Sequence, residues 1–110
     1  MHHQMGVMGG QCFAFHGYLP QGDSERQQVI KRLENASKSA DQTQIVIETP
    51  YRNAALFGSL LQHLRPETRL CLAVALTTPE ESIRTLPISA WRKVPLPVFD
   101  KRPAVFLFKQ

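Results

Sequence analysis

The sequence predicts an α/β fold: a single layered domain with a mixed five-stranded sheet flanked by helices. Three observations support this prediction. Apolar segments of strand length alternate with longer segments whose apolar residues recur at helical spacing. The first three strands are joined by helices, and right-handed crossovers make such strands run parallel. The later strands are joined by short links, so we expect them to run antiparallel.

Length and composition are those of an ordinary globular chain. The 110 residues suffice for one domain with its own core, and 43% of them are hydrophobic and 20% charged, which argues against disorder. A two-domain enzyme with its cofactor between the domains does not fit this length. Thirteen Lys and Arg against nine Asp and Glu leave a net charge of +4. The basic residues are scattered, which favours a solvated surface over a nucleic-acid patch.

The sequence contains no targeting, membrane or metal signal. No apolar run approaches the roughly 20 residues of a membrane helix, and the N-terminus lacks a signal-peptide pattern, so we expect a cytoplasmic protein without membrane contact. The two cysteines, Cys12 and Cys71, lie in apolar surroundings and are expected to be reduced and buried. No Cys or His spacing suggests zinc, and no metal site is predicted.

One folded domain is expected over 12–110, after an irregular N-terminal entry over 1–11. The glycines of this entry do not form a dinucleotide fingerprint. Alternating or continuous apolar residues predict five strands, which cover 13–18, 44–47, 69–76, 82–86 and 104–108. The third strand is apolar throughout, and we therefore expect it to lie in the centre of the sheet.

Two long helices and one helical turn are expected between these strands. The first helix starts with a capping box at Ser24, and its spacing places Glu34 on the polar face. The second helix is capped by Thr49 and has Pro50 at its first position, where the missing N–H costs nothing. A short helical turn is expected over 87–92.

Polar residues gather after two of the predicted strands, where ligand sites in α/β sheets form. Segment 48–53 (E-T-P-Y-R-N) closes the second strand and opens a helix, whose first N–H groups can bind a polar ligand. Helix capping explains part of this segment, so a site and a cap are both open interpretations. Segment 76–81 follows the third strand, and its threonine hydroxyls either bind a ligand or form a local turn.

No catalytic residue emerges from the sequence. A G-x-S-x-G motif is absent, and neither cysteine has a histidine nearby in the chain. Cys71 and Ser59 are interpreted as packing residues of a strand and a helix. His16 lies at a strand end and His63 late in a helix, and both are interpreted as structural.

Four motifs, in order along the chain, resemble a known family. They are F-H-G-Y-L-P over 15–20, E-T-P-Y-R over 48–52, L-T with E-E over 76–81, and K-R-P-A-V-F over 101–106. In these motifs the chain resembles the C-terminal domain of the tetrapyrrole (corrin/porphyrin) methylase family of S-adenosylmethionine-dependent methyltransferases. The nearest branch is that of the bacterial small-subunit ribosomal RNA ribose 2′-O-methyltransferases.

The resemblance implies a parent enzyme of two α/β domains that binds S-adenosylmethionine in the cleft between them. It assigns 12–110 to the C-terminal domain, without the N-terminal domain, and implies homodimers. Small side chains would let the cofactor approach the backbone closely. The positions that match the family's cofactor contacts are Glu48, Thr49, Ala73, Thr77, Pro103 and Ala104.

The expected function is that of a C-terminal domain or truncated form of an S-adenosylmethionine-dependent methyltransferase, which contributes half of the cofactor cleft and is inactive alone. Its expected partners are the missing N-terminal domain and a second copy of the chain. The alternatives are a non-catalytic dimerisation or binding module and an RNA-binding fragment, the latter suggested by the net charge of +4. The acceptor is open among RNA, tetrapyrrole and protein. Where the RNA branch carries an Arg-Glu pair, this sequence has Val74 and Ala75.

Overall fold

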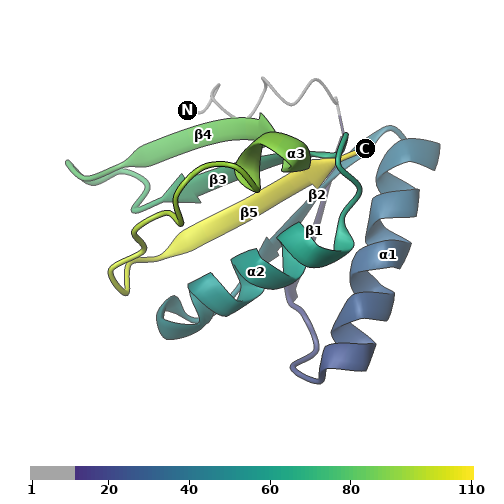
Figure 1. Ribbon diagram of the computed structural model, residues 1–110, viewed down its shortest axis with the longest axis horizontal. Coiled ribbons are helices and arrows are strands. Elements are labelled where there is room, and N and C mark those ends of the chain that lie inside the picture. The colour runs from purple at the N-terminus through teal and green to yellow at the C-terminus, as the bar shows by residue number, and fades with distance from the viewer. Residues whose placement is uncertain (1–11) are drawn as a thin grey trace.

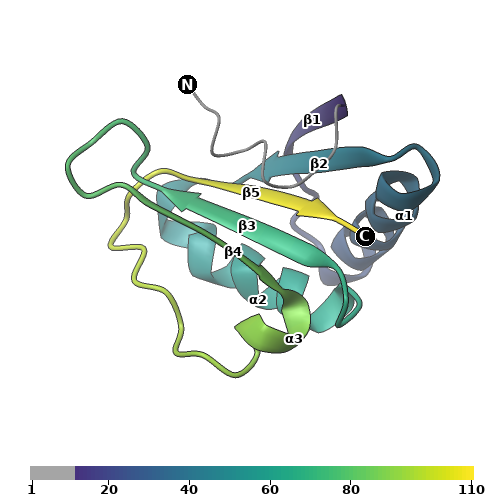
Figure 2. The ribbon, with the colours of Figure 1, turned by 90° about the horizontal axis from the view of Figure 1, so that it is seen from above.

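One face of a five-stranded sheet carries all three α-helices in the computed structural model, which describes residues 12–110 (Figure 1 and Figure 2). The irregular entry expected over 1–11 lies outside the described residues. In chain order the elements are β1 (Cys12–Tyr18), α1 (Asp23–Ser39), β2 (Gln42–Ile47), the 3-10 turn η2 (Pro50–Arg52), α2 (Asn53–His63), β3 (Arg69–Val74), β4 (Ser82–Pro87), α3 (Ile88–Trp91) and β5 (Ala104–Lys109).

The sheet is mixed, and its strand order is β1-β2-β5-β3-β4. β1 and β2 pair in parallel, while β5 runs antiparallel to both β2 and β3, and β4 runs antiparallel to β3. The predicted fold class is therefore confirmed. The prediction that β3 is central is wrong. β5 takes the middle position, because its apolar residues are covered on both faces and it pairs with two strands at once.

The main core lies between the helices and one face of the sheet. Successive strand residues point to opposite faces, so alternate residues of β5 such as Phe106 and Phe108 face the helices. Ile30 of α1 and Phe57 of α2 belong to the same buried cluster. Phe57 packs edge-to-face on Trp91, with ring centroids 5.4 Å apart and an interplanar angle of 85°. This contact anchors α3 to α2.

The opposite face of the sheet carries no helix among the described residues. Cys71 and Leu107 are buried there, with Ile45 and other partly buried residues against them. Cys71 is free and buried as expected, and burial raises the pKa of its thiol. The matching expectation for Cys12 is wrong: its thiol is free but exposed, because β1 is an edge strand with little cover.

Two predicted boundaries differ from the observed ones. α1 begins at Asp23, and its N-cap residue Gly22 makes no side-chain bond, so the capping box at Ser24 is not formed. β3 ends at Val74 rather than at residue 76, because Ala75 has a φ of +55°, which no strand tolerates.

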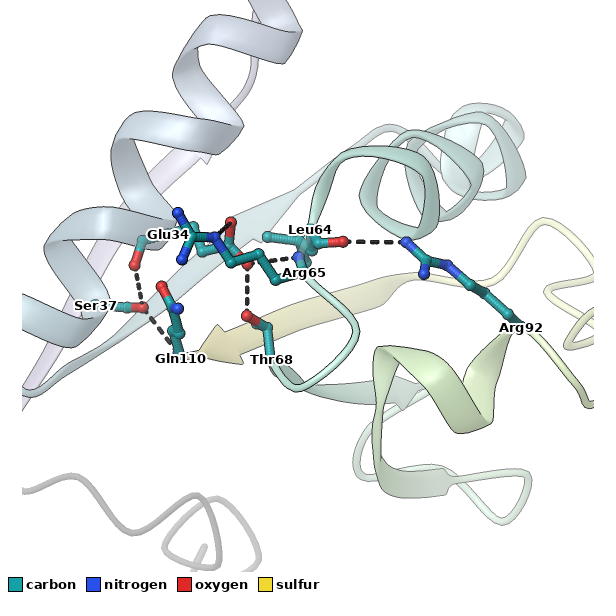
Figure 3. A network of polar contacts seen from close by, with 7 residues as sticks. All are labelled: Glu34, Ser37, Leu64, Arg65, Thr68, Arg92 and Gln110. Atoms are coloured by element: carbon teal, nitrogen blue, oxygen red, sulfur yellow. Dashed lines mark hydrogen bonds and ion pairs between the residues drawn. The ribbon is translucent and has the colours of Figure 1, made fainter.

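A buried carboxylate ties the elements together at one end of the sheet (Figure 3). Glu34 of α1 is only 1% exposed, although its position in the helix was assigned to the polar face. Its Oε2 accepts hydrogen bonds from the backbone N–H of Arg65, at 2.7 Å, and from the hydroxyl of Thr68. One turn on, the hydroxyl of Ser37 accepts the backbone N–H of Gln110 at 2.9 Å. Side chains of α1 thus hold the chain before β3 and the end of β5.

A second polar contact at the same end closes α2. The guanidinium of Arg92 donates to the carbonyl oxygen of Leu61 at 2.6 Å and to that of Leu64 at 3.1 Å. These carbonyls lie at the helix C-terminus, where intrahelical donors run out. Arg92 therefore caps α2 from the segment that follows α3. In the described part of the chain, no helix has the length and apolar character needed to cross a membrane.

Glu34→Ala should lower the free energy of unfolding by about 2–4 kcal/mol, because two donors near the buried carboxylate lose their acceptor. Urea denaturation followed by circular dichroism measures this loss. Glu67→Ala serves as the control, since Glu67 is exposed and lies in the same connection; we expect a change within about 0.5 kcal/mol. Equal losses in the two variants would contradict the structural role of Glu34.

Candidate functional site

The ends of several strands meet at the edge of the sheet opposite to Glu34. β2 and β3 both run towards this edge, and β5 begins there between them. In the strand register Ile47 lies beside Val105, and Val74 lies beside Ala104. The residues that follow β2 and β3 therefore flank the start of β5. Such an edge is where ligands bind in open α/β sheets.

The turn after β2 is built around Glu48. This side chain is 8% exposed, its Oε1 accepts the backbone N–H of Thr49 at 2.9 Å, and its Oε2 lies 3.8 Å from Nε of Arg52. Thr49 is the N-cap of η2 and Pro50 follows at the first position, as predicted. The Thr49 side chain makes no capping bond, however, so its hydroxyl remains available for another partner.

Asn53 holds the start of β5 in place. The side chain is fully buried, and its Nδ2 donates to the carbonyl oxygen of Arg102 at 2.9 Å. On the other side, the backbone N–H of Ala75 donates to the carbonyl oxygen of Pro103 at 2.8 Å. The chain entering β5 is therefore fixed from both neighbouring strand ends. The sequence analysis gave Asn53 no role of its own, and its only signal was a polar residue between a predicted turn and an apolar helix.

The structure places the remaining predicted positions differently from one another. Pro103 and Ala104 lie between the ends of β2 and β3, next to Glu48 and Thr49. Ala73 is buried in β3, one residue before the strand end, and points to the helix-free face. Thr77 is exposed in the loop after β3, and its backbone N–H donates to Oε1 of Glu81 at 2.8 Å. Thr77 is the outlier, because it lies beyond the sheet edge.

Backbone strain concentrates at this edge. Five non-glycine residues of the described chain have a positive φ, and four of them follow β3 or precede β5: Ala75, Thr77, Asp100 and Lys101. A positive φ is least tolerated at a β-branched residue such as Thr77, whose φ is +64°. Residues in such conformations persist only where the surroundings hold them, and they are frequent at binding sites.

Unpaired polar atoms also concentrate at this edge. Within the described chain, five buried side-chain atoms lack a hydrogen-bond partner, and three belong to the turn after β2: Oγ1 of Thr49, Nε of Arg52 and Oδ1 of Asn53. Buried polar atoms in folded proteins are nearly always paired. Because Nε of Arg52 lies 3.8 Å from Glu48, it has an ionic contact that is too long for a hydrogen bond. The turn thus offers a hydroxyl and a carbonyl to a polar ligand.

A hollow of about 270 Å³ opens beside this edge, on the side that carries the helices. Leu72, Val74 and Trp91 form apolar walls, while Glu80, Ser82 and Arg102 bring polar groups. Arg84 also lines the hollow, and its guanidinium lies 5.5 Å from the Trp91 ring centroid. The combination of apolar walls and a charged rim is typical of small-molecule sites.

The other candidate residues have structural partners. His16 sits at a bulge in β1, and its Nε2 lies 2.6 Å from Oε1 of Gln44, which agrees with a structural interpretation. Over 12–110, no three His, Cys, Asp or Glu side chains gather closely enough to hold a metal ion.

Comparisons with known proteins match the fold but not the sequence. No protein-family model matches the chain, and no curated protein sequence matches it. The crystal structure of the methyltransferase CobJ has a TM-score of 0.51 and 20% identity over 94% of this chain and 45% of that chain. The native form of uroporphyrin III C-methyl transferase from Thermus thermophilus has a TM-score of 0.51 and 18% identity, over 92% and 41%.

A further structure of the Thermus thermophilus enzyme, complexed with S-adenyl homocysteine, has a TM-score of 0.47 and 17% identity, over 92% of this chain and 42% of that chain. At these identities the comparisons establish a shared fold. The chain spans less than half the length of each of these methyltransferases.

Thr77→Gly should raise the free energy of unfolding by about 0.5–1 kcal/mol, because glycine relieves the positive φ at a larger gain than its extra freedom in the unfolded chain costs. Chemical denaturation measures the gain. Thr78→Gly is the control: its hydroxyl donates to the carbonyl of Ala75 at 2.7 Å, so we expect a loss of about 1 kcal/mol. A loss in both variants would argue against strain at Thr77.

Proposed function

We propose that this chain contributes half of the cofactor cleft of an S-adenosylmethionine-dependent methyltransferase of the tetrapyrrole methylase type, and that it is inactive alone. One observation supports this proposal most. Positions that the sequence resemblance assigns to the cofactor lie at neighbouring strand ends: Glu48 and Thr49 follow β2, and Pro103 and Ala104 open β5 beside them.

The residues at this edge suit S-adenosylmethionine chemically. The cofactor carries amino and hydroxyl groups on its adenosine part, and the unpaired Oγ1 of Thr49 and Oδ1 of Asn53 can accept from such donors. Ala73 and Ala104 are small enough for a flat base or a sugar to approach the sheet backbone. A hydroxyl, a buried amide carbonyl and two alanines at strand ends thus form one plausible wall of a cofactor site.

The proposed part played by this chain is binding and orientation. S-adenosylmethionine supplies a methyl group on a positively charged sulfur, and transfer requires an acceptor atom held in line with that bond. Glu48 is engaged by the backbone of Thr49 and by Arg52, so we assign it to holding the turn rather than to removing a proton. Rate enhancement in the parent enzyme then depends mainly on positioning the two reactants.

The methyl acceptor is a finer proposal with two classes. A tetrapyrrole is favoured here over ribosomal RNA, because the apolar, buried Val74 and Ala75 stand where the RNA branch carries an Arg-Glu pair. The net charge of +4 is the observation that favours RNA. A second copy of the chain and the complementary N-terminal domain remain the proposed protein partners.

S-adenosylhomocysteine should bind the isolated chain only weakly, with a dissociation constant in the millimolar range, because half of the cleft walls are present. Chemical-shift titration by NMR measures this affinity. Thr49→Val should weaken binding several-fold, since it removes the unpaired hydroxyl without changing the side-chain shape.

Thr43→Val is the matched control for this titration. Thr43 also has a buried, unpartnered hydroxyl among the described residues, but it lies near the start of β2, far from the proposed cleft. It should bind like the parent chain. Equal effects of the two substitutions, or no shift changes at millimolar ligand, would contradict the proposed edge. Nanomolar affinity would contradict the claim that the chain is half of a cleft.

RNA should not be retained by the chain, even at low salt, if the acceptor is a tetrapyrrole. Fluorescence anisotropy with a labelled RNA stem-loop tests this. Binding that weakens steeply as salt rises would instead support the RNA alternative, since phosphate contacts release counterions. Sedimentation of the same sample measures self-association, and a strict monomer would remove the dimerisation module.

A further inference from the structure

We propose that Asn53 is a positioning residue for the cofactor edge, holding the peptide between Arg102 and Pro103 so that the start of β5 faces the cleft in one conformation. The proposal rests on the proposed function for its cofactor part. Nothing in the sequence motifs assigns this role, because the matching positions lie before and after Asn53 but do not include it.

The hydrogen bonds single out one peptide. The carbonyl oxygen of Arg102 accepts Nδ2 of Asn53 at 2.9 Å, and the next carbonyl, that of Pro103, accepts the backbone N–H of Ala75 at 2.8 Å. Two consecutive carbonyls are thus held from opposite sides. Both Asp100 and Lys101, which precede this peptide, have a positive φ, so the chain enters the clamp from a strained turn. Without the clamp, that strain would favour another path into β5.

An amide is the group that suits this position. The side chain is fully buried, and a carbonyl oxygen left without a donor in such a place costs the full desolvation penalty. Nδ2 supplies that donor without bringing a charge. Oδ1 of the same amide is one of the unpaired atoms of the turn, so a single side chain fixes β5 on one side and offers an acceptor on the other.

Charged groups around Asn53 are already paired with each other. On its own turn, Arg52 lies 3.8 Å from Glu48, and on the facing segment Arg102 lies 3.3 Å from Asp100. A carboxylate introduced at position 53 would therefore be buried and would face a carbonyl oxygen. Both conditions raise its pKa and favour the protonated form, which donates a hydrogen bond where the amide did.

The test is Asn53→Asp, read out by the hydrogen-exchange protection of the Ala75 amide, which donates to the adjacent Pro103 carbonyl. At neutral pH the substituted carboxylate repels the Arg102 carbonyl, and we expect protection to fall at least about tenfold. As the pH drops through the raised pKa, the protonated carboxyl donates again and protection should return towards that of the parent chain. Asn53→Ala should lose protection at every pH.

Asn35→Asp is the matched control, because Asn35 is exposed on α1 and the chemical change is the same. Its protection should equal that of the parent chain. The clamp is overturned if Asn53→Asp and Asn35→Asp behave alike at neutral pH, or if the loss in Asn53→Asp does not recover in acid. Should Asn53→Asp unfold at neutral pH, Asn53→Ser, which keeps a donor, must retain more protection than Asn53→Ala.

The cofactor part is tested separately by titrating the same variants with S-adenosylhomocysteine. Asn53→Asp should bind several-fold more weakly than the parent at neutral pH and should regain affinity in acid, whereas Asn35→Asp should match the parent. Unchanged affinity in Asn53→Asp, with protection lost, overturns the positioning role and leaves the proposed function standing. Absence of binding by the parent chain overturns the proposed function, while the exchange result still decides the clamp.

Discussion

The pairing of β5 with both β2 and β3 is the constraint on which the rest of the structure depends. The sheet order places no other strand between the β1–β2 pair and the β3–β4 pair, so β5 alone joins the two halves. Its direction also matters. Because β5 runs antiparallel to both neighbours, it begins where they end. The backbone of 102–104 is thereby brought between the turns that follow β2 and β3, and every feature of the candidate site follows from that placement.

The two ends of the sheet are built in different ways. At one end Glu34 and Ser37 satisfy backbone and hydroxyl donors, and α1 is tied there to the start of β3 and the end of β5. At the other end the turns carry positive φ angles and unpaired polar atoms. Paired polar groups stabilise a fold, whereas strained and unpaired groups are kept where a ligand can use them. This difference supports the choice of the second end as the site.

Periodicity was enough to predict each strand and helix, because every element buries one face and so repeats its apolar residues. Pairing order lay beyond it: β3 and β5 are both apolar throughout, and only the return of 92–103 along the sheet decides which is central. Burial of single polar residues was also beyond it. Glu34 and Asn53 look like surface residues in the sequence, and their partners, Thr68 and Arg102, are far along the chain. The site positions were suggested by motif resemblance rather than by physical reasoning from the residues.

The central claim is that the ends of β2 and β3 and the start of β5 form one wall of an S-adenosylmethionine cleft. Isotope-filtered NOEs between S-adenosylhomocysteine and the isotope-labelled chain test it most directly, since they report contacts within about 5 Å of individual methyl groups in a weak complex. The account predicts contacts from the ligand to the methyl groups of Ala73 and Ala104 and to the γ-methyl group of Thr49. Contacts confined to the opposite end of the sheet, around Thr68 and Leu64, would contradict it.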